Sequence, residues 1–115
     1  MRYFFERLYW RCIWSWAGTH DAWKNEYSFR SWAWANVVSA LLAFWLLEGA
    51  ERALIFGLGI LVLAAEAMNT AIERTVDLIS KEKSDLARRA KDAGSAGLAL
   101  TAVAAGVAWL AVLLG

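Results

Sequence analysis

The residues best suited to chemistry form a polar stripe that begins inside a strongly apolar stretch: Glu66, Asn69, Glu73 and Asp77. On a helix, the three carboxylates fall within roughly 40° of one another, and the asparagine lies about 60° to one side. A carboxylate inside a membrane is costly, so it usually faces a protein interior or a water-filled site and marks function. The stripe is therefore the leading candidate site. For Glu66 alone, a packing contact that fixes helix register is the alternative.

The composition indicates an integral membrane protein. Of the 115 residues, 60% are hydrophobic, whereas soluble domains usually hold about 45–50%. The net charge of +1 argues against a nucleic-acid partner, which normally brings a clear basic excess. A single cysteine, Cys12, and a single histidine, His20, argue against a zinc site or a Cys/His nucleophile. Residues 1–17 are too charged and too aromatic for a secretory signal peptide.

The elements that must position the stripe are predicted to be helices, so the fold class is an all-α membrane protein. Residues 1–27 are rich in tryptophan and predict an amphipathic helix on the membrane surface, with a break and a new N-cap at Gly18-Thr-His-Asp21. Three membrane spans, a turn and a charged loop follow. The spans are predicted at 31–47, at 53–80 with a cytoplasmic extension, and at 93–115, with the turn at 48–52 and the loop at 81–92.

The basic residues predict the orientation of these spans. Eleven of the twelve lysines and arginines lie before the first span or around the loop between the second and third, Arg52 being the exception. The positive-inside rule then places the N-terminus and the loop 81–92 in the cytoplasm and the C-terminus outside. Glu66 would lie about 10 Å below the cytoplasmic boundary, with Glu73 and Asp77 at or beyond it. That arrangement suits chemistry between a lipid and a soluble substrate.

These residue types favour phosphoryl transfer onto a membrane alcohol. The sequence holds neither of the glycine-rich phosphate loops, G-x-x-x-x-G-K-[ST] and G-x-G-x-x-G. Carboxylates are ligands for Mg²⁺, which commonly takes one or two of them together with phosphate oxygens. A buried carboxylate could accept a hydroxyl proton, and Lys91 beside Asp92 could offset phosphate charge. A channel or proton pathway lined by the same carboxylates stays open on this reasoning.

Two motifs add a specific resemblance. The run Glu66-Ala-Met-Asn-Thr-Ala-Ile-Glu73, followed by Ala90-Lys-Asp-Ala-Gly-Ser-Ala96, closely resembles the signature of the bacterial membrane diacylglycerol kinase family, which includes the undecaprenol kinases. The similarity continues upstream at Ser15-Trp16, Trp23 and Asn25-Glu26-x-x-Phe29-Arg30. The resemblance implies three transmembrane helices and an N-terminal surface helix, assembled as a homotrimer with composite active sites in the bacterial inner membrane. It also implies ATP- and Mg²⁺-dependent phosphorylation of a lipid hydroxyl.

The resemblance assigns roles to the residues of the polar stripe. The family's proposed catalytic base falls on Glu66, and the carboxylates that bind magnesium with the nucleotide fall on Glu26 and Glu73. Asn69 matches the supporting asparagine of the active site.

Further positions match nucleotide and lipid contacts of the family. Lys91 and Asp92 match the pair that contacts the nucleotide, while Arg7 and Ser95 match lipid-contacting positions near the interface. Trp14 stands where relatives often have a tyrosine near the nucleotide.

Other features leave alternatives open. Glu82-Lys83-Ser84 departs from the family's usual loop, which puts the contacts to the adenosine in doubt. Diacylglycerol is favoured as the acceptor because Gly94-Ser95-Ala96 resembles the branch that uses it, with undecaprenol as the alternative. A non-enzymatic small membrane protein is the remaining hypothesis. Arg74 and Asp77 are expected in surface or inter-subunit ion pairs rather than in catalysis.

Overall fold

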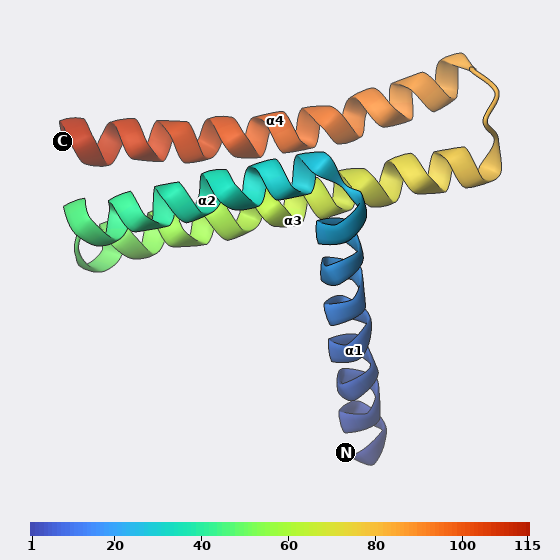
Figure 1. The fold of residues 1–115 in the computed structure, drawn as a ribbon, viewed down its shortest axis with the longest axis horizontal. Helices are drawn as coiled ribbons and strands as arrows, with labels where there is room; N and C mark the ends of the chain where they lie inside the picture. The colour runs from blue at the N-terminus through green and yellow to red at the C-terminus, as the bar shows by residue number, and fades with distance from the viewer.

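The chain consists of α-helices and no strands. A computed structural model describes all residues, 1–115, and contains four helices: α1 (Arg2–Asn25), α2 (Tyr27–Leu46), α3 (Gly49–Ile79) and α4 (Asp85–Leu114). Figure 1 shows α2, α3 and α4 as a bundle of successive antiparallel helices, with α1 projecting from it at a steep angle. Within the bundle, α3 packs against both α2 and α4. The predicted all-α class is confirmed.

The expected break at residues 18–21 is wrong, because α1 continues through it to Asn25. One glycine costs a helix only about 1 kcal/mol relative to alanine, and the neighbouring polar side chains bond within the helix. Thr19 donates to the carbonyl of Ser15, and Asn25 donates to Asp21. The chain turns instead at Glu26, which takes an extended conformation (φ −115°, ψ 109°) between α1 and α2.

A two-residue turn joins α2 to α3. Leu47 and Glu48 are extended, and α3 begins at Gly49, whose φ of +55° is the only positive value in the chain. The turn is therefore tighter than the expected 48–52 segment. Arg52 helps to close it by donating to the carbonyls of Leu47 (3.0 Å) and Phe44 (2.8 Å), which satisfies acceptors left free at the end of α2.

The charged segment 81–92 is only partly a loop. Ser84 accepts a hydrogen bond from the backbone N–H of Ala87, so it caps α4, which begins at Asp85. Arg88 then pairs with Asp85 (2.8 Å) and with Asp92 (3.0 Å) at helical spacing. These local bonds extend the helix about two turns ahead of the apolar run that starts at residue 93.

The outer surface of the bundle is apolar. Only 11 of 115 residues are buried, and large hydrophobic side chains are exposed along α2, α3 and α4. By length and composition, α3 and α4 could cross a membrane, whereas α2 does not reach the same hydropathy. The tryptophans, serines and asparagine of α2 lower its hydropathy. The first span, 31–47, therefore stays a prediction.

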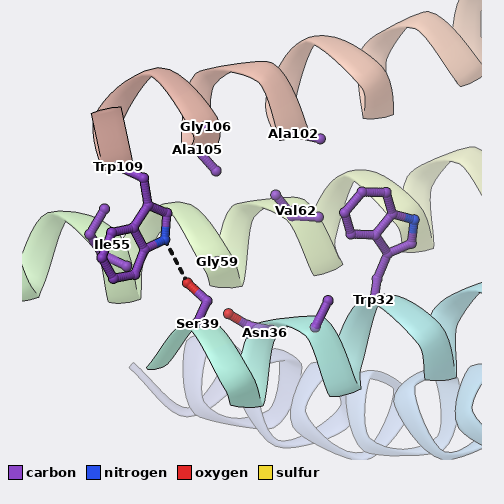
Figure 2. A pocket seen from close by; sticks show the side chains of 11 residues that line it. Trp32, Asn36, Ser39, Ile55, Gly59, Val62, Ala102, Ala105, Gly106 and Trp109 are labelled. Carbon is purple, nitrogen blue, oxygen red and sulfur yellow. Dashed lines mark hydrogen bonds between the residues drawn. The ribbon is translucent and has the colours of Figure 1, made fainter. Parts of the chain in front are cut away.

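A partly open cavity of about 170 Å³ lies between α2, α3 and α4. Figure 2 shows polar side chains of α2 directed into it: Ser39 accepts a hydrogen bond from the indole of Trp109 on α4 (2.9 Å), and Asn36 lies against Gly59 of α3. Near the α2–α3 turn, a small apolar core of Ala43, Ile55 and their neighbours closes the bundle.

Candidate active site

The buried carboxylate of the stripe is Glu66, which is 2% exposed. The hydroxyl of Ser28, in the first turn of α2, donates a hydrogen bond to its Oε1, so the contact joins α2 to α3. The other oxygen, Oε2, is buried and has no hydrogen-bond partner in the chain. Because buried polar atoms in proteins are nearly always paired, an unpaired carboxylate oxygen points to a ligand or proton donor from outside the chain.

One turn further along α3, Asn69 and Glu73 form a second polar pair. The amide of Asn69 donates to Oε1 of Glu73 at 3.2 Å, while its own Oδ1 is buried without a partner. Gly94 of α4 packs against this amide, because a Cβ atom there would lie 2.6 Å from Oδ1. The glycine of the Ala90–Ala96 motif is thus needed for close approach of α4 to the stripe.

A charged cluster ties the end of α1 to α3. Arg74 donates from one guanidinium nitrogen to Asp21 and from the other to Oε1 of Glu26, the second bond being 2.8 Å long. The hydrogen bond from Arg74 and a weaker one from Asn25 lower the pKa of Asp21 below its ordinary value. Arg30 donates to two carbonyls at the end of α1 and fixes the corner further. Arg74 therefore finds both of its partners within the chain.

The predicted nucleotide-contacting pair lies at the start of α4. Lys91 donates to Asp77 of α3 at 2.7 Å, and Asp92 accepts from Arg88 at 3.0 Å. Asp77 is thereby the partner of the candidate phosphate-binding lysine, and it too pairs within the chain. These side chains border an open concave surface together with the turn 80–84.

Three of the predicted site residues lie apart from this constellation. Arg7 bonds to the hydroxyl of Tyr3 (2.7 Å), and Trp14 stacks on Trp10 with ring centroids 6.2 Å apart. Both are exposed on α1, which carries Arg7 about 28 Å and Trp14 about 18 Å along the helix from Glu26. Ser95 is exposed on α4 and makes no side-chain hydrogen bond.

Sequence reasoning missed the partners that come from other helices. Ser28 and Asp21 are separated from their partners on α3 by 38 and 53 residues, so helical periodicity does not detect them. Gly94 belongs to the Ala90–Ala96 motif, but its contact with Asn69 depends on how α4 packs. For Arg74, the available signal was its positive charge directly after Glu73.

No group of three or more histidine, cysteine, aspartate or glutamate side chains lies close enough together in the chain to hold a metal ion by itself. The acidic residues of the site come from three places: Asp21 and Glu26 from the end of α1 and the corner after it, Glu66, Glu73 and Asp77 from α3, and Asp92 from α4.

Fold and site together define a class: a small helical membrane-type protein with a buried, half-paired carboxylate and a row of charged side chains beyond it. The family model described as prokaryotic diacylglycerol kinase matches residues 13–113. A diacylglycerol kinase of Escherichia coli K12 is 36% identical over 110 residues, 95% of this chain and 90% of its own. That of Pseudomonas aeruginosa is 42% identical over 102 residues, 86% and 81% of the two chains. A third, from Haemophilus influenzae, is 36% identical over 97 residues, 84% and 82%.

The chain belongs to the prokaryotic diacylglycerol kinase family. Its membership confirms the predicted resemblance and the predicted enzyme class, a lipid kinase of the membrane. The non-enzymatic reading is thereby set aside.

Proposed function

We propose that this chain transfers the γ-phosphoryl group of ATP to the free hydroxyl of diacylglycerol, giving ADP and phosphatidic acid. The observation that carries the proposal is the carboxylate of Glu66, whose Oε1 is held by Ser28 and whose Oε2 is buried and unpaired. A carboxylate oxygen in that state can accept the proton of a substrate hydroxyl. Family membership supports the choice of ATP and of a lipid acceptor.

In the transfer, the hydroxyl oxygen of the lipid forms a bond to the γ-phosphorus, and the bond from that phosphorus to the bridging oxygen of ADP breaks. The hydroxyl proton goes to Oε2 of Glu66. Asn69 supports the site through its bond to Glu73. Lys91, held by Asp77, offsets negative charge on the phosphates, and Asp92 contacts the nucleotide.

We assign Glu26 and Glu73 as the protein ligands of Mg²⁺. Each carboxylate uses only Oε1 in a side-chain hydrogen bond, to Arg74 and to Asn69 respectively, and keeps Oε2 for a ligand. This donor set fits an ion that takes one or two carboxylates and completes its shell with phosphate oxygens and water. When bound, Mg²⁺ supplies charge neutralisation at the phosphates.

We infer that the active enzyme is a homotrimer with shared sites. One chain buries only 11 of its residues and encloses little around a nucleotide. Arg7, Trp14 and Ser95 keep their proposed roles in lipid and nucleotide contact. Because Arg7 and Trp14 lie far along α1 from Glu26, they serve the membrane surface or the site of a neighbouring subunit.

The protein would lie in the inner membrane with its N-terminus and site in the cytoplasm and its C-terminus outside.

The test is ATP-dependent phosphate incorporation in mixed micelles, with dioleoylglycerol and undecaprenol compared as acceptors. We expect preference for dioleoylglycerol and a loss of about 10²–10⁴-fold in Glu66→Gln, the range of general-base catalysis. A matched control is Glu51→Gln, an exposed carboxylate in the first turn of the same helix. Preference for undecaprenol would keep the mechanism and change the acceptor. Full activity of Glu66→Gln would refute the role of this carboxylate.

A further inference from the structure

The forked contact of Arg74 joins two carboxylates that come from different places on the chain. Asp21 lies in the last turns of α1, whereas Glu26 lies at the corner between α1 and α2. Asp21 is itself held by Asn25 (2.7 Å), so its carboxylate is anchored within α1. A planar guanidinium with donors in a fixed fork suits such double pairing, and a lysine ammonium does not reproduce it.

The backbone around Glu26 does not by itself fix the direction of its side chain. Glu26 is the N-cap residue of α2, yet its side chain makes no capping hydrogen bond. Its carboxylate is bound instead by Arg74, with Nη2 to Oε1 at 2.8 Å. Since long acidic side chains have several rotamers, Arg74 is what selects the one in which Glu26 faces α3.

Arg74 also follows Glu73 directly on α3. Neighbouring helical positions differ by about 100° in direction, so Glu73 faces Asn69 while Arg74 reaches toward the α1–α2 corner. Arg74 thus holds the corner carboxylate of Glu26 against α3, at the position that follows Glu73 in the chain. Asp21 and Glu26 bring two negative charges to the single positive charge of Arg74, so this ion-paired cluster keeps a net charge of −1.

We propose that Arg74 is a positioning residue that orients Glu26 for the metal–nucleotide site, an inference that rests on the proposed function. Arg74 does not touch the reacting atoms. It holds Oε1 of Glu26 and leaves Oε2 without a side-chain hydrogen bond, in the way that outer hydrogen bonds orient metal-binding side chains in general. Asp21 anchors the other arm of the guanidinium.

The experiment measures binding of Mn²⁺ to the full-length protein in detergent by electron paramagnetic resonance, with a non-hydrolysable ATP analogue present. We expect Arg74→Gln to weaken Mn²⁺ binding by about 10–100-fold, the range found for residues that orient metal ligands. Arg74→Lys should recover part of the loss, because it restores one charge without the fork. Asp21→Asn, which leaves the Arg74–Glu26 bond in place, should change Mn²⁺ binding by less than about threefold. Arg2→Gln, which removes an exposed pair with Glu6, is the matched control.

Thermal unfolding and steady-state kinetics separate positioning from a merely structural role. We expect Arg74→Gln to raise the KM for Mg·ATP, with full recovery of kcat at high Mg²⁺. A lower Tm with unchanged Mn²⁺ affinity would overturn the proposal, as would an equal loss of affinity in Asp21→Asn. If Arg74→Gln does not fold, Arg74→Lys and Asp21→Asn provide the same comparison. Failure of the wild-type protein to bind Mn²⁺ would refute the metal site itself, whereas wild-type binding with an unaffected Arg74→Gln would refute this inference alone.

Discussion

The hydroxyl of Ser28 donates its hydrogen bond to one oxygen of Glu66 and leaves the other oxygen unpaired. This contact links the first turn of α2 to the middle of α3, so the position of the candidate base depends on packing of the two helices. It also restricts the rotation of a carboxylate that would otherwise sample several directions. A general base must lie within hydrogen-bond reach of the proton it abstracts, and a fixed carboxylate meets that condition more often.

Ser28→Ala is therefore expected to lower kcat about tenfold, in line with the loss of a group that orients a catalytic residue. The KM for ATP should change little, because Ser28 contacts the proposed base and not the nucleotide residues. Ser31→Ala is the control, since its hydroxyl donates only to the backbone carbonyl of Tyr27. Steady-state assays with dioleoylglycerol test the effect. Wild-type kcat in Ser28→Ala would show that the contact is dispensable.

The contact between Gly94 and Asn69 gives a second prediction. In Gly94→Ala, the new methyl group would lie 2.6 Å from Oδ1 of Asn69 and 3.3 Å from Cδ1 of Ile72, so the amide must move. Movement of the amide breaks its bond to Glu73, and we expect activity to fall about tenfold or more. Gly97→Ala is the matched control on the same helix, because nothing lies within 4 Å of a Cβ atom there.

For this second prediction, the comparison is between kcat/KM of the two alanine variants. The control should keep wild-type activity and unfold at the same or a slightly higher temperature, since alanine favours a helix over glycine by up to about 1 kcal/mol. Equal activity in both variants would mean that the Asn69–Glu73 bond does not support catalysis.

The ion pair of Asp21 predicts a dependence of stability on pH. Arg74, which also pairs with Glu26, faces Asp21 together with Asn25 and the neighbouring His20, and these groups lower the pKa of Asp21 below its ordinary 3.8. A group whose folded pKa is depressed contributes stability that is present in full above the unfolded pKa and is lost as the pH falls through the folded pKa. The contribution of Asp21 should thus be constant above pH 3.8 and disappear below it.

Thermal unfolding of wild type and Asp21→Asn in detergent, followed from pH 7 to pH 3, measures this contribution. The difference in Tm should be constant near neutral pH and shrink in the acid range. A difference that stays the same down to pH 3 would contradict the ion pair as its cause. A difference that grows with acidity would mean that another group is responsible.

The residues of the acidic stripe could be predicted from the sequence, whereas the residues of other helices that contact them could not. The stripe at Glu66, Asn69 and Glu73 follows from a 3.6-residue period in one helix, a local property that a sequence displays directly. The corner at Glu26 was misplaced to residues 18–21, because Gly-Thr-His-Asp is a typical N-terminal signal. Asp21 is held instead by Asn25 of its own helix and by Arg74 of α3, and the second contact cannot be read from local sequence. The partners Ser28 and Gly94 depend on which helices pack together, and periodicity holds no information on that. The chemical roles of the site residues came from the resemblance to the family and not from periodicity.

The last prediction concerns Asn36 and Gly59 in the cavity of Figure 2. A Cβ atom at Gly59 would lie 1.9 Å from Oδ1 of Asn36, so the asparagine of α2 fills the place left by the glycine of α3. Small residues allow helices to approach closely where no hydrophobic force holds them together in lipid. Gly59→Ala should therefore displace the asparagine and lower the free energy of unfolding by about 1–3 kcal/mol, the usual cost of overpacking.

The double variant Asn36→Ala/Gly59→Ala should recover most of the lost stability, because the clash is removed from the other side. Gly57→Ala is the control, since nothing lies within 4 Å of a Cβ atom at that position. Unfolding of wild type, Asn36→Ala, Gly59→Ala and the double variant in mixed micelles gives the four free energies of the cycle, and their coupling tests the contact. Additive effects of the two substitutions would show that Asn36 and Gly59 do not pack against each other in the membrane. A strong coupling with unchanged kinase activity would separate this contact, which holds α2 to α3, from the acidic stripe that performs the chemistry.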